Sequence, residues 1–107
     1  MIELPFPPAV LSPNARPHYM EKARAFKKYK AACVALMLNA RKALAGRNTF
    51  AVTFHPPTAH RFDLDNLIGR WKAGCDALAA ITGVDDSEFI LTFKKGEVRK
   101  GGAVVIA

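Results

Sequence analysis

Residues 49–55 read TFAVTFH, and residues 64–81 read LDNLIGRWKAGCDALAAI. In the first stretch, large apolar residues alternate with smaller or polar ones, which predicts a strand with one buried face. In the second, apolar residues recur at spacings of three and four, which predicts a helix, although Gly69 and Gly74 weaken it. A strand followed by an amphipathic helix indicates a domain in which helices pack on a sheet.

Similar patterns extend to both ends of the chain. We expect a strand within residues 1–8, a helix over 20–45 that stops at Gly46, a strand near 89–93 and a final strand over 103–107. The order β-α-β-α-β-β predicts an α+β domain with two helices packed on one mixed sheet. The last two strands are expected to form a C-terminal antiparallel hairpin.

Length and composition place the chain in a broad class. The 107 residues predict one domain over 1–107, and a composition of 50% hydrophobic and 23% charged residues is ordinary for a globular protein. The longest apolar run, residues 31–38, is too short for a membrane helix. Only two cysteines are present, and the first residues show no signal-peptide pattern. We therefore expect a cytoplasmic protein with reduced thiols, without a membrane partner or a small-molecule cofactor.

Charge is divided unevenly along the chain. Residues 1–62 contain ten basic and two acidic residues, whereas residues 63–107 contain six basic and seven acidic ones. All five aspartates fall between Asp63 and Asp86. A basic body indicates a polyanionic partner, and carboxylates beside a polyanion usually require a divalent cation. The distribution therefore favours nucleic acid together with a metal ion.

On one continuous helix over 64–81, Asp65, Gly69, Lys72 and Asp76 would share a narrow stripe away from the apolar face. Carboxylates can hold magnesium for phosphodiester hydrolysis, and a lysine can stabilise charge on the phosphate. The alternative is structural: an aspartate caps the helix, Lys72 and Asp76 form an exposed pair, and the later aspartates fill a turn. Spacing alone leaves both interpretations open.

Several motifs taken together are familiar. The segments Asp63-Leu-Asp-Asn-Leu67 and Gly83-Val-Asp-Asp-Ser87 enclose Lys72-Ala and Asp76-Ala-Leu78. With the opening Leu4-Pro-Phe-Pro-Pro8, they resemble the RusA-like Holliday junction resolvases, small endonucleases common in phages and prophages. The resemblance covers nearly the whole chain. It implies a homodimer in a bacterial or phage-infected cell that cuts branched DNA, namely four-way junctions in recombination and repair, by paired nicks leaving 5′-phosphates.

The resemblance also implies roles for individual residues. Asp63, Asp65 and Asp86 would hold Mg²⁺, with Mn²⁺ as an alternative ion, and Lys72 would be the active-site lysine. Further residues would contact DNA beside the site, along the first helix and on the C-terminal turn: Asn66, Arg61, Arg70, Arg16, His18, Lys27, Lys28, Lys94 and Lys95.

Two departures from the family pattern leave choices open. An insertion near residues 68–71 lengthens the spacing from Asn66 to Lys72, so Arg70 could share the basic role. Phe62 stands where an arginine is common, with Arg61 one residue earlier. Periodicity does not decide which of Asp85 and Asp86 faces the metal. A catalytically inactive basic DNA-binding module or regulator is the alternative function.

Overall fold

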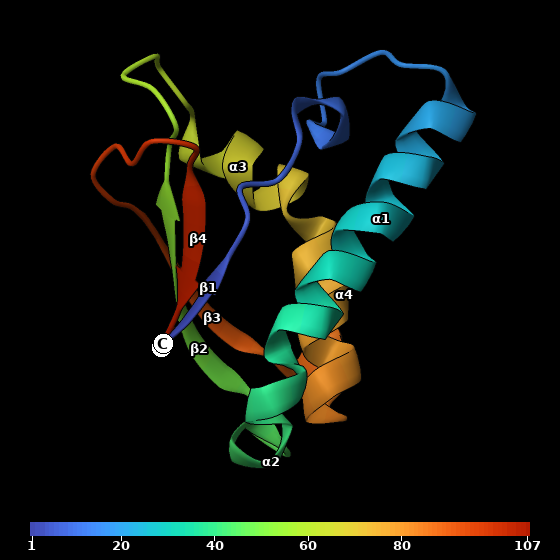
Figure 1. Cartoon of the computed structure of the whole chain (residues 1–107), viewed down its shortest axis with the longest axis vertical. Helices are drawn as coiled ribbons and strands as arrows, with labels where there is room; N and C mark the ends of the chain where they lie inside the picture. Colours follow the sequence, from blue (N-terminus) through green and yellow to red (C-terminus); the bar gives the residue numbers. More distant parts are fainter.

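A four-stranded mixed sheet forms one layer of the protein (Figure 1). The computed structural model describes all residues 1–107. Its strands are β1 (Ile2–Leu4), β2 (Thr49–His55), β3 (Ile90–Lys95) and β4 (Ala103–Ile106), in the spatial order β1-β4-β2-β3. β2 is parallel to β3 and antiparallel to β4, and β4 is antiparallel to β1.

The helices form the second layer on one face of the sheet. They are α1 (Tyr19–Met37), α2 (Arg41–Leu44), α3 (Leu64–Arg70) and α4 (Lys72–Thr82), with short 3₁₀ turns η1 (Ala9–Leu11), η2 (Leu38–Ala40) and η3 (Asp86–Glu88). α1 and α4 lie side by side (Figure 1). The predicted α+β class, the element order and the mixed sheet are confirmed, but each predicted helix is divided into two.

The C-terminal strands differ from the expected hairpin in one respect. β3 and β4 run in opposite directions, as predicted, yet β2 lies between them and hydrogen-bonds to both. The crossover through α3 and α4 returns β3 parallel to β2 on its outer side, which leaves the inner side of β2 for β4. A sequence pattern shows where strands lie and does not show which strands are neighbours.

The predicted alternation of buried and exposed side chains along β2 is confirmed. Phe50, Val52 and Phe54 point toward the helices and are buried, whereas Thr49 and Ala51 are exposed. The ring of Phe54 stacks on that of Phe93 with centroids 5.9 Å apart, and Trp71 meets Phe54 edge-on at 6.1 Å. This aromatic cluster joins the sheet to the junction between α3 and α4.

The helix predicted over 64–81 is interrupted at Trp71, and α3 turns away from the direction of α4 (Figure 1). Trp71 has φ −95° and ψ 12°, and its N–H is shared between the carbonyls of Leu67 and Ile68. Its side chain is buried directly over Gly74, where a Cβ would lie 2.1 Å from the indole nitrogen. The single stripe predicted for Asp65, Gly69, Lys72 and Asp76 is therefore broken between Gly69 and Lys72.

No helix combines the length and the apolar character that a membrane crossing requires.

Candidate functional site

Lys72, the first residue of α4, lies at the centre of a small charged cluster. Its Nζ donates to Asp76 Oδ1 at 2.5 Å and to Asp86 Oδ2 at 2.9 Å. The lysine side chain is 57% exposed, while the two aspartate side chains are 30% and 38% exposed. One ammonium group thus bridges two half-buried carboxylates at the surface.

Local structure explains why these three groups meet. Asp76 lies one helical turn after Lys72 on α4, which places the two side chains on the same face. At the other end of α4, Gly83 adopts φ 73°, a left-handed conformation that suits glycine and stops the helix. The chain then turns into η3, whose first residue is Asp86. A helix spacing and a short turn therefore bring residues 72, 76 and 86 together.

The neighbouring Asp85 has a structural role in the turn. Its side chain accepts a hydrogen bond of 2.9 Å from the backbone N–H of Ser87 and so caps η3. This hydrogen bond lowers the pKa of the Asp85 carboxyl. The sequence left open which of Asp85 and Asp86 faces a metal ion, and in the structure only Asp86 contacts Lys72.

The charge state of Lys72 follows from its partners. Hydrogen bonds to Asp76 and then to Asp86 raise the pKa of the Lys72 ammonium well above its ordinary value. Lys72 therefore stays protonated at neutral pH. Such a group can stabilise negative charge on a phosphate, but it cannot act as a general base.

Asp63 and Asp65 lie apart from this cluster. Asp63 pairs with Arg61 at 3.2 Å, and both side chains are exposed. Asp65 Oδ1 accepts from the N–H of Asn66 in the first turn of α3. No three His, Cys, Asp or Glu side chains are close enough together to hold a metal ion. The predicted set Asp63, Asp65 and Asp86 is not gathered in this structure.

Two carboxylates are sufficient ligands for a magnesium ion that keeps most of its water molecules. Asp76 and Asp86 already direct carboxylate oxygens at a single cation, the ammonium of Lys72. Magnesium prefers oxygen ligands and is often held by one or two carboxylates, several waters and a substrate phosphate. Asp76 is the ligand candidate that the sequence did not assign. Its signal was the i,i+4 spacing to Lys72, which also matches an ordinary surface pair.

Arg70 forms no ion pair with Asp76 or Asp86. Its Nε donates to the carbonyl of Pro7 at 2.8 Å, and its guanidinium lies 5.0 Å from the ring centre of Phe6 and 6.0 Å from that of Phe62. Burial lowers the pKa of this guanidinium. Arg70 therefore ties the chain after β1 to α3, and Lys72 is the basic residue that faces the acids.

A second tie joins α3 to the loop near η1. The hydroxyl of Ser12 donates to Asn66 Oδ1 at 2.9 Å, and Pro13 packs so closely on Gly69 that a Cβ there would lie 2.6 Å from the proline ring. Asn66 thus ties α3 to this loop.

The other predicted DNA contacts occupy several places. Arg16 is exposed in the loop before α1, and His18 caps α1 by accepting from the N–H of Met20 at 3.2 Å. Lys27 and Lys28 are exposed on α1. Lys94 lies on β3, whereas Lys95 donates to the carbonyl of Phe62 at 2.7 Å and so fixes the segment before α3.

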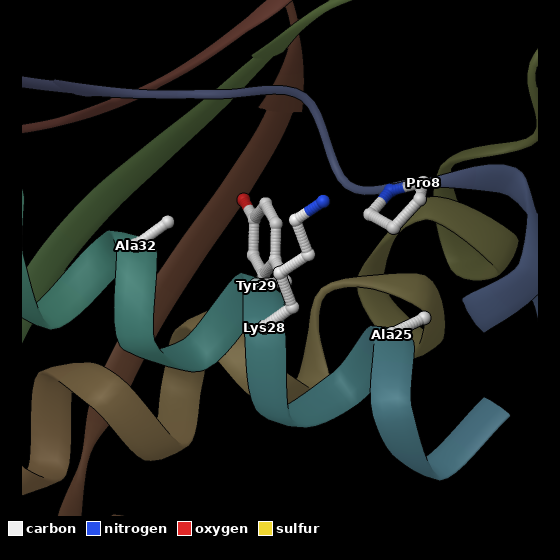
Figure 2. Close-up of a pocket in the computed structure, with 5 residues that line it drawn as sticks. All are labelled: Pro8, Ala25, Lys28, Tyr29 and Ala32. Carbon is white, nitrogen blue, oxygen red and sulfur yellow. The ribbon is translucent and has the colours of Figure 1, made fainter. Parts of the chain in front are cut away.

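An apolar pocket of about 340 Å³ lies elsewhere, between α1 and the chain after β1 (Figure 2). Its lining contains Pro8, Ala25, Ala32 and the ring of Tyr29, with Lys28 at its edge. The hydroxyl of Tyr29 donates to the carbonyl of Pro5 at 2.6 Å, and burial raises its pKa far above the usual range. With its only buried hydroxyl already bonded, this pocket offers no reactive group.

Comparison with known proteins gives one relationship. No protein-family model matches the sequence. The chain is similar to an uncharacterized protein of Xylella fastidiosa (strain Temecula1 / ATCC 700964), with 34% identity over 114 aligned residues that cover 98% of this chain and 72% of that protein. This chain therefore belongs to the same family as the Xylella protein.

Proposed function

We propose that this family member is a magnesium-dependent endodeoxyribonuclease that resolves branched DNA. The observation that carries the proposal is the bridge from Lys72 to Asp76 and Asp86, where two carboxylates and a protonated amine converge at the surface. The net charge of +7 supports a polyanionic substrate. The choice of a four-way junction, and of a homodimer placing two sites for paired cuts, rests on the motif resemblance to the RusA-like resolvases.

In this proposal Asp76 and Asp86 hold the ion, and Asp65 and Asp63 approach it from α3 when DNA is bound. When bound, magnesium polarises the phosphate and makes water nucleophilic near neutral pH. Lys72 then turns from its carboxylate partners to the scissile phosphate. A lysine with an ordinary pKa of about 10.4 is protonated at neutral pH, so Lys72 carries a positive charge there and stabilises the negative charge that develops on the oxygens.

Cleavage of a synthetic four-way junction with Mg²⁺, beside a linear duplex of the same arms, tests the proposal. We expect paired symmetric nicks in the junction only, and none with EDTA. Asp86→Asn and Lys72→Met should each lower the rate by about 100-fold or more, the scale of losing one electrostatic contact to the transition state. Asp85→Asn is the matched control, since Asp85 caps η3 and makes no contact with Lys72.

Asp65→Asn tests the contribution of α3. A comparable loss in this variant would support the approach of Asp65 to the ion in the DNA complex. Full activity of Asp65→Asn would restrict the site to α4 and η3. Junction cleavage that is unaffected by both Asp86→Asn and Lys72→Met would overturn the assigned site.

A DNA-binding module without activity is the second candidate. One observation favours it: Lys72 already offsets the charge of Asp76 and Asp86, so this surface can meet phosphate without a metal ion. Tight junction binding with no cleavage under any divalent cation would select this candidate over the nuclease.

A further inference from the structure

A pocket of about 290 Å³ opens directly beside the charged cluster. It lies between the start of α1, the loop after η1 and the end of α3, and Lys72 forms part of its wall. The other lining residues are Leu11, Pro13, Lys22, Phe26, Gly69 and Arg70. Its volume is near the lower end of the range for small-molecule sites. We call it the α1–η1 pocket.

Lys22 is the unexplained group in this pocket. Its side chain is half-buried, and its ammonium has neither an ion-pair partner nor a side-chain hydrogen bond. A cation that lines a pocket and has no partner is a favourable position for an anion. Lys72, on the other wall, is shared with Asp76 and Asp86, so an anion in the pocket would lie next to the residues of the proposed reaction.

Part of the wall is apolar. The half-buried ring of Phe26, with Leu11 and Pro13, gives a surface that a phosphate alone does not need. Nucleic-acid bases stack on aromatic side chains irrespective of sequence, because every base has a π-face. A cation beside an aromatic wall thus matches the two ends of a nucleotide, its phosphate and its base.

Two contacts join the loop side of the wall to α3. Pro13 packs against Gly69, and the bond from Ser12 to Asn66 holds the loop on α3. Arg70 lines the pocket as well, but its guanidinium is directed to Pro7 and to the rings of Phe6 and Phe62. Lys22 is therefore the cation that is free to bind.

We propose that the α1–η1 pocket holds one unstacked nucleotide of the DNA, with its phosphate on Lys22 and its base against Phe26. This inference rests on the proposed function, since the neighbouring phosphodiester would then reach Lys72. Taking a base out of the stack costs least where pairing is already weakened, as at a branch point. The pocket would thereby give preference for branched over linear DNA.

Direct binding is tested on the full chain in metal-free buffer by NMR titration with dTMP, thymidine and inorganic phosphate. We expect dTMP to shift the signals of the Phe26 ring and the Gly69 amide more than thymidine or phosphate alone does. Lys22→Gln should weaken dTMP binding roughly fivefold, the equivalent of one exposed charge contact. Phe26→Leu should weaken binding of dTMP and leave that of phosphate unchanged. Lys42→Gln, an exposed lysine on the distant α2, should change neither.

Two results would overturn the pocket: dTMP causes no shifts at these residues, or phosphate alone matches dTMP and Phe26→Leu has no effect. A second arm separates DNA from a free nucleotide. In an Asp86→Asn background, Lys22→Gln should reduce the slope of log affinity for the junction against log salt by about 1, while Lys42→Gln leaves it unchanged. An unchanged slope in Lys22→Gln excludes a DNA nucleotide as the occupant.

These readouts do not depend on cleavage. Binding of dTMP by a chain that cuts no junction would leave the pocket standing and remove the nuclease. Normal junction cleavage by a Lys22→Gln variant, with no dTMP binding by the unaltered chain, would support the nuclease and exclude the nucleotide pocket.

Discussion

Helices α3 and α4 come from one predicted helix, yet they are held in the fold by different means. Six of the eleven residues of α4 are buried, namely Ala73, Gly74, Ala77, Leu78, Ile81 and Thr82. Of the seven residues in α3, only Leu67 is buried. α4 is therefore fixed by the core, whereas α3 is held largely by contacts at its edges, such as those of Asn66 with Ser12 and of Arg70 with Pro7.

The difference explains which acids are positioned. Lys72 and Asp76 belong to α4, and their geometry is supported by the core beneath them. Asp65 belongs to α3 and bonds only to the backbone beside it. Groups placed on firmly packed elements are held more precisely than groups on weakly packed ones. Substitutions in the two helices should therefore differ in their effect on stability.

The largest effect is expected at Trp71, the residue between the two helices. Trp71 is 1% exposed and contacts the rings of Phe54 and Phe93. Trp71→Ala should lower the free energy of unfolding by about 3–5 kcal/mol, the usual cost of emptying a large aromatic site. Urea denaturation followed by circular dichroism measures it. A loss below about 1 kcal/mol would show that the junction does not depend on this side chain.

A matched pair of glycines compares the helices directly. A Cβ at Gly74 would lie 2.1 Å from the buried indole nitrogen of Trp71, so Gly74→Ala should cost about 1–3 kcal/mol by overpacking. A Cβ at Gly69 would lie 2.6 Å from the ring of Pro13, which is exposed and can shift slightly toward solvent. There the helix propensity gained from alanine, about 1 kcal/mol, offsets the contact. In thermal unfolding, the midpoint temperature of Gly74→Ala should be well below that of Gly69→Ala. Equal decreases in the midpoint temperature would contradict the contrast between the helices.

Much of the fold follows from local patterns in the sequence. Alternation at Phe50, Val52 and Phe54 located β2, and apolar periodicity located both helical segments. The break at Trp71 was not predicted, because an interrupted helix keeps nearly the same periodicity, and the indole packs over Gly74 only through tertiary contacts. The place of β4 between β1 and β2 is likewise a long-range property.

The candidate site was predicted in part. Lys72 and Asp86 were singled out and do meet, across 14 positions of the chain. Asp76 was placed on the stripe of Lys72 and in the family motif, but it was given no metal-binding role, and Lys22 was not singled out. The contact of Asp86 with Lys72 depends on how η3 folds back to α4, and the place of Lys22 in the pocket depends on how α1 faces α3. These are matters of packing that the spacing along one element does not contain.

The bridge at Lys72 should contribute little to stability, in contrast with the core under α4. In a double-mutant cycle of Lys72→Met and Asp86→Asn, we expect a coupling of at most about 1 kcal/mol, because the lysine is 57% exposed and screened by solvent. The raised pKa of Lys72 determines how the contribution of the bridge to stability changes with pH. The contribution is complete below the ordinary lysine pKa, about 10.4, and is lost as the pH rises through the higher folded value. Coupling that grows with pH between 9 and 11, about one unit either side of that ordinary value, would contradict this.

The smallest effect is expected at Asp85, which caps η3 beside the bridge. The backbone N–H of Ser87 lowers the pKa of this carboxyl, so its stabilising contribution is present above the ordinary aspartate pKa, about 3.9, and is lost as the pH falls through the lower folded value. Asp85→Asn keeps an oxygen that can cap the turn. The variant should therefore unfold at a slightly lower temperature than the unaltered chain near pH 6, and the gap should close near pH 2. Ser87→Ala, which keeps the backbone donor, should retain most of this pH dependence. If the difference in unfolding temperature instead widened in acid, protonation of Asp85 would stabilise the folded chain. The turn that carries Asp86 would then not be held by this cap.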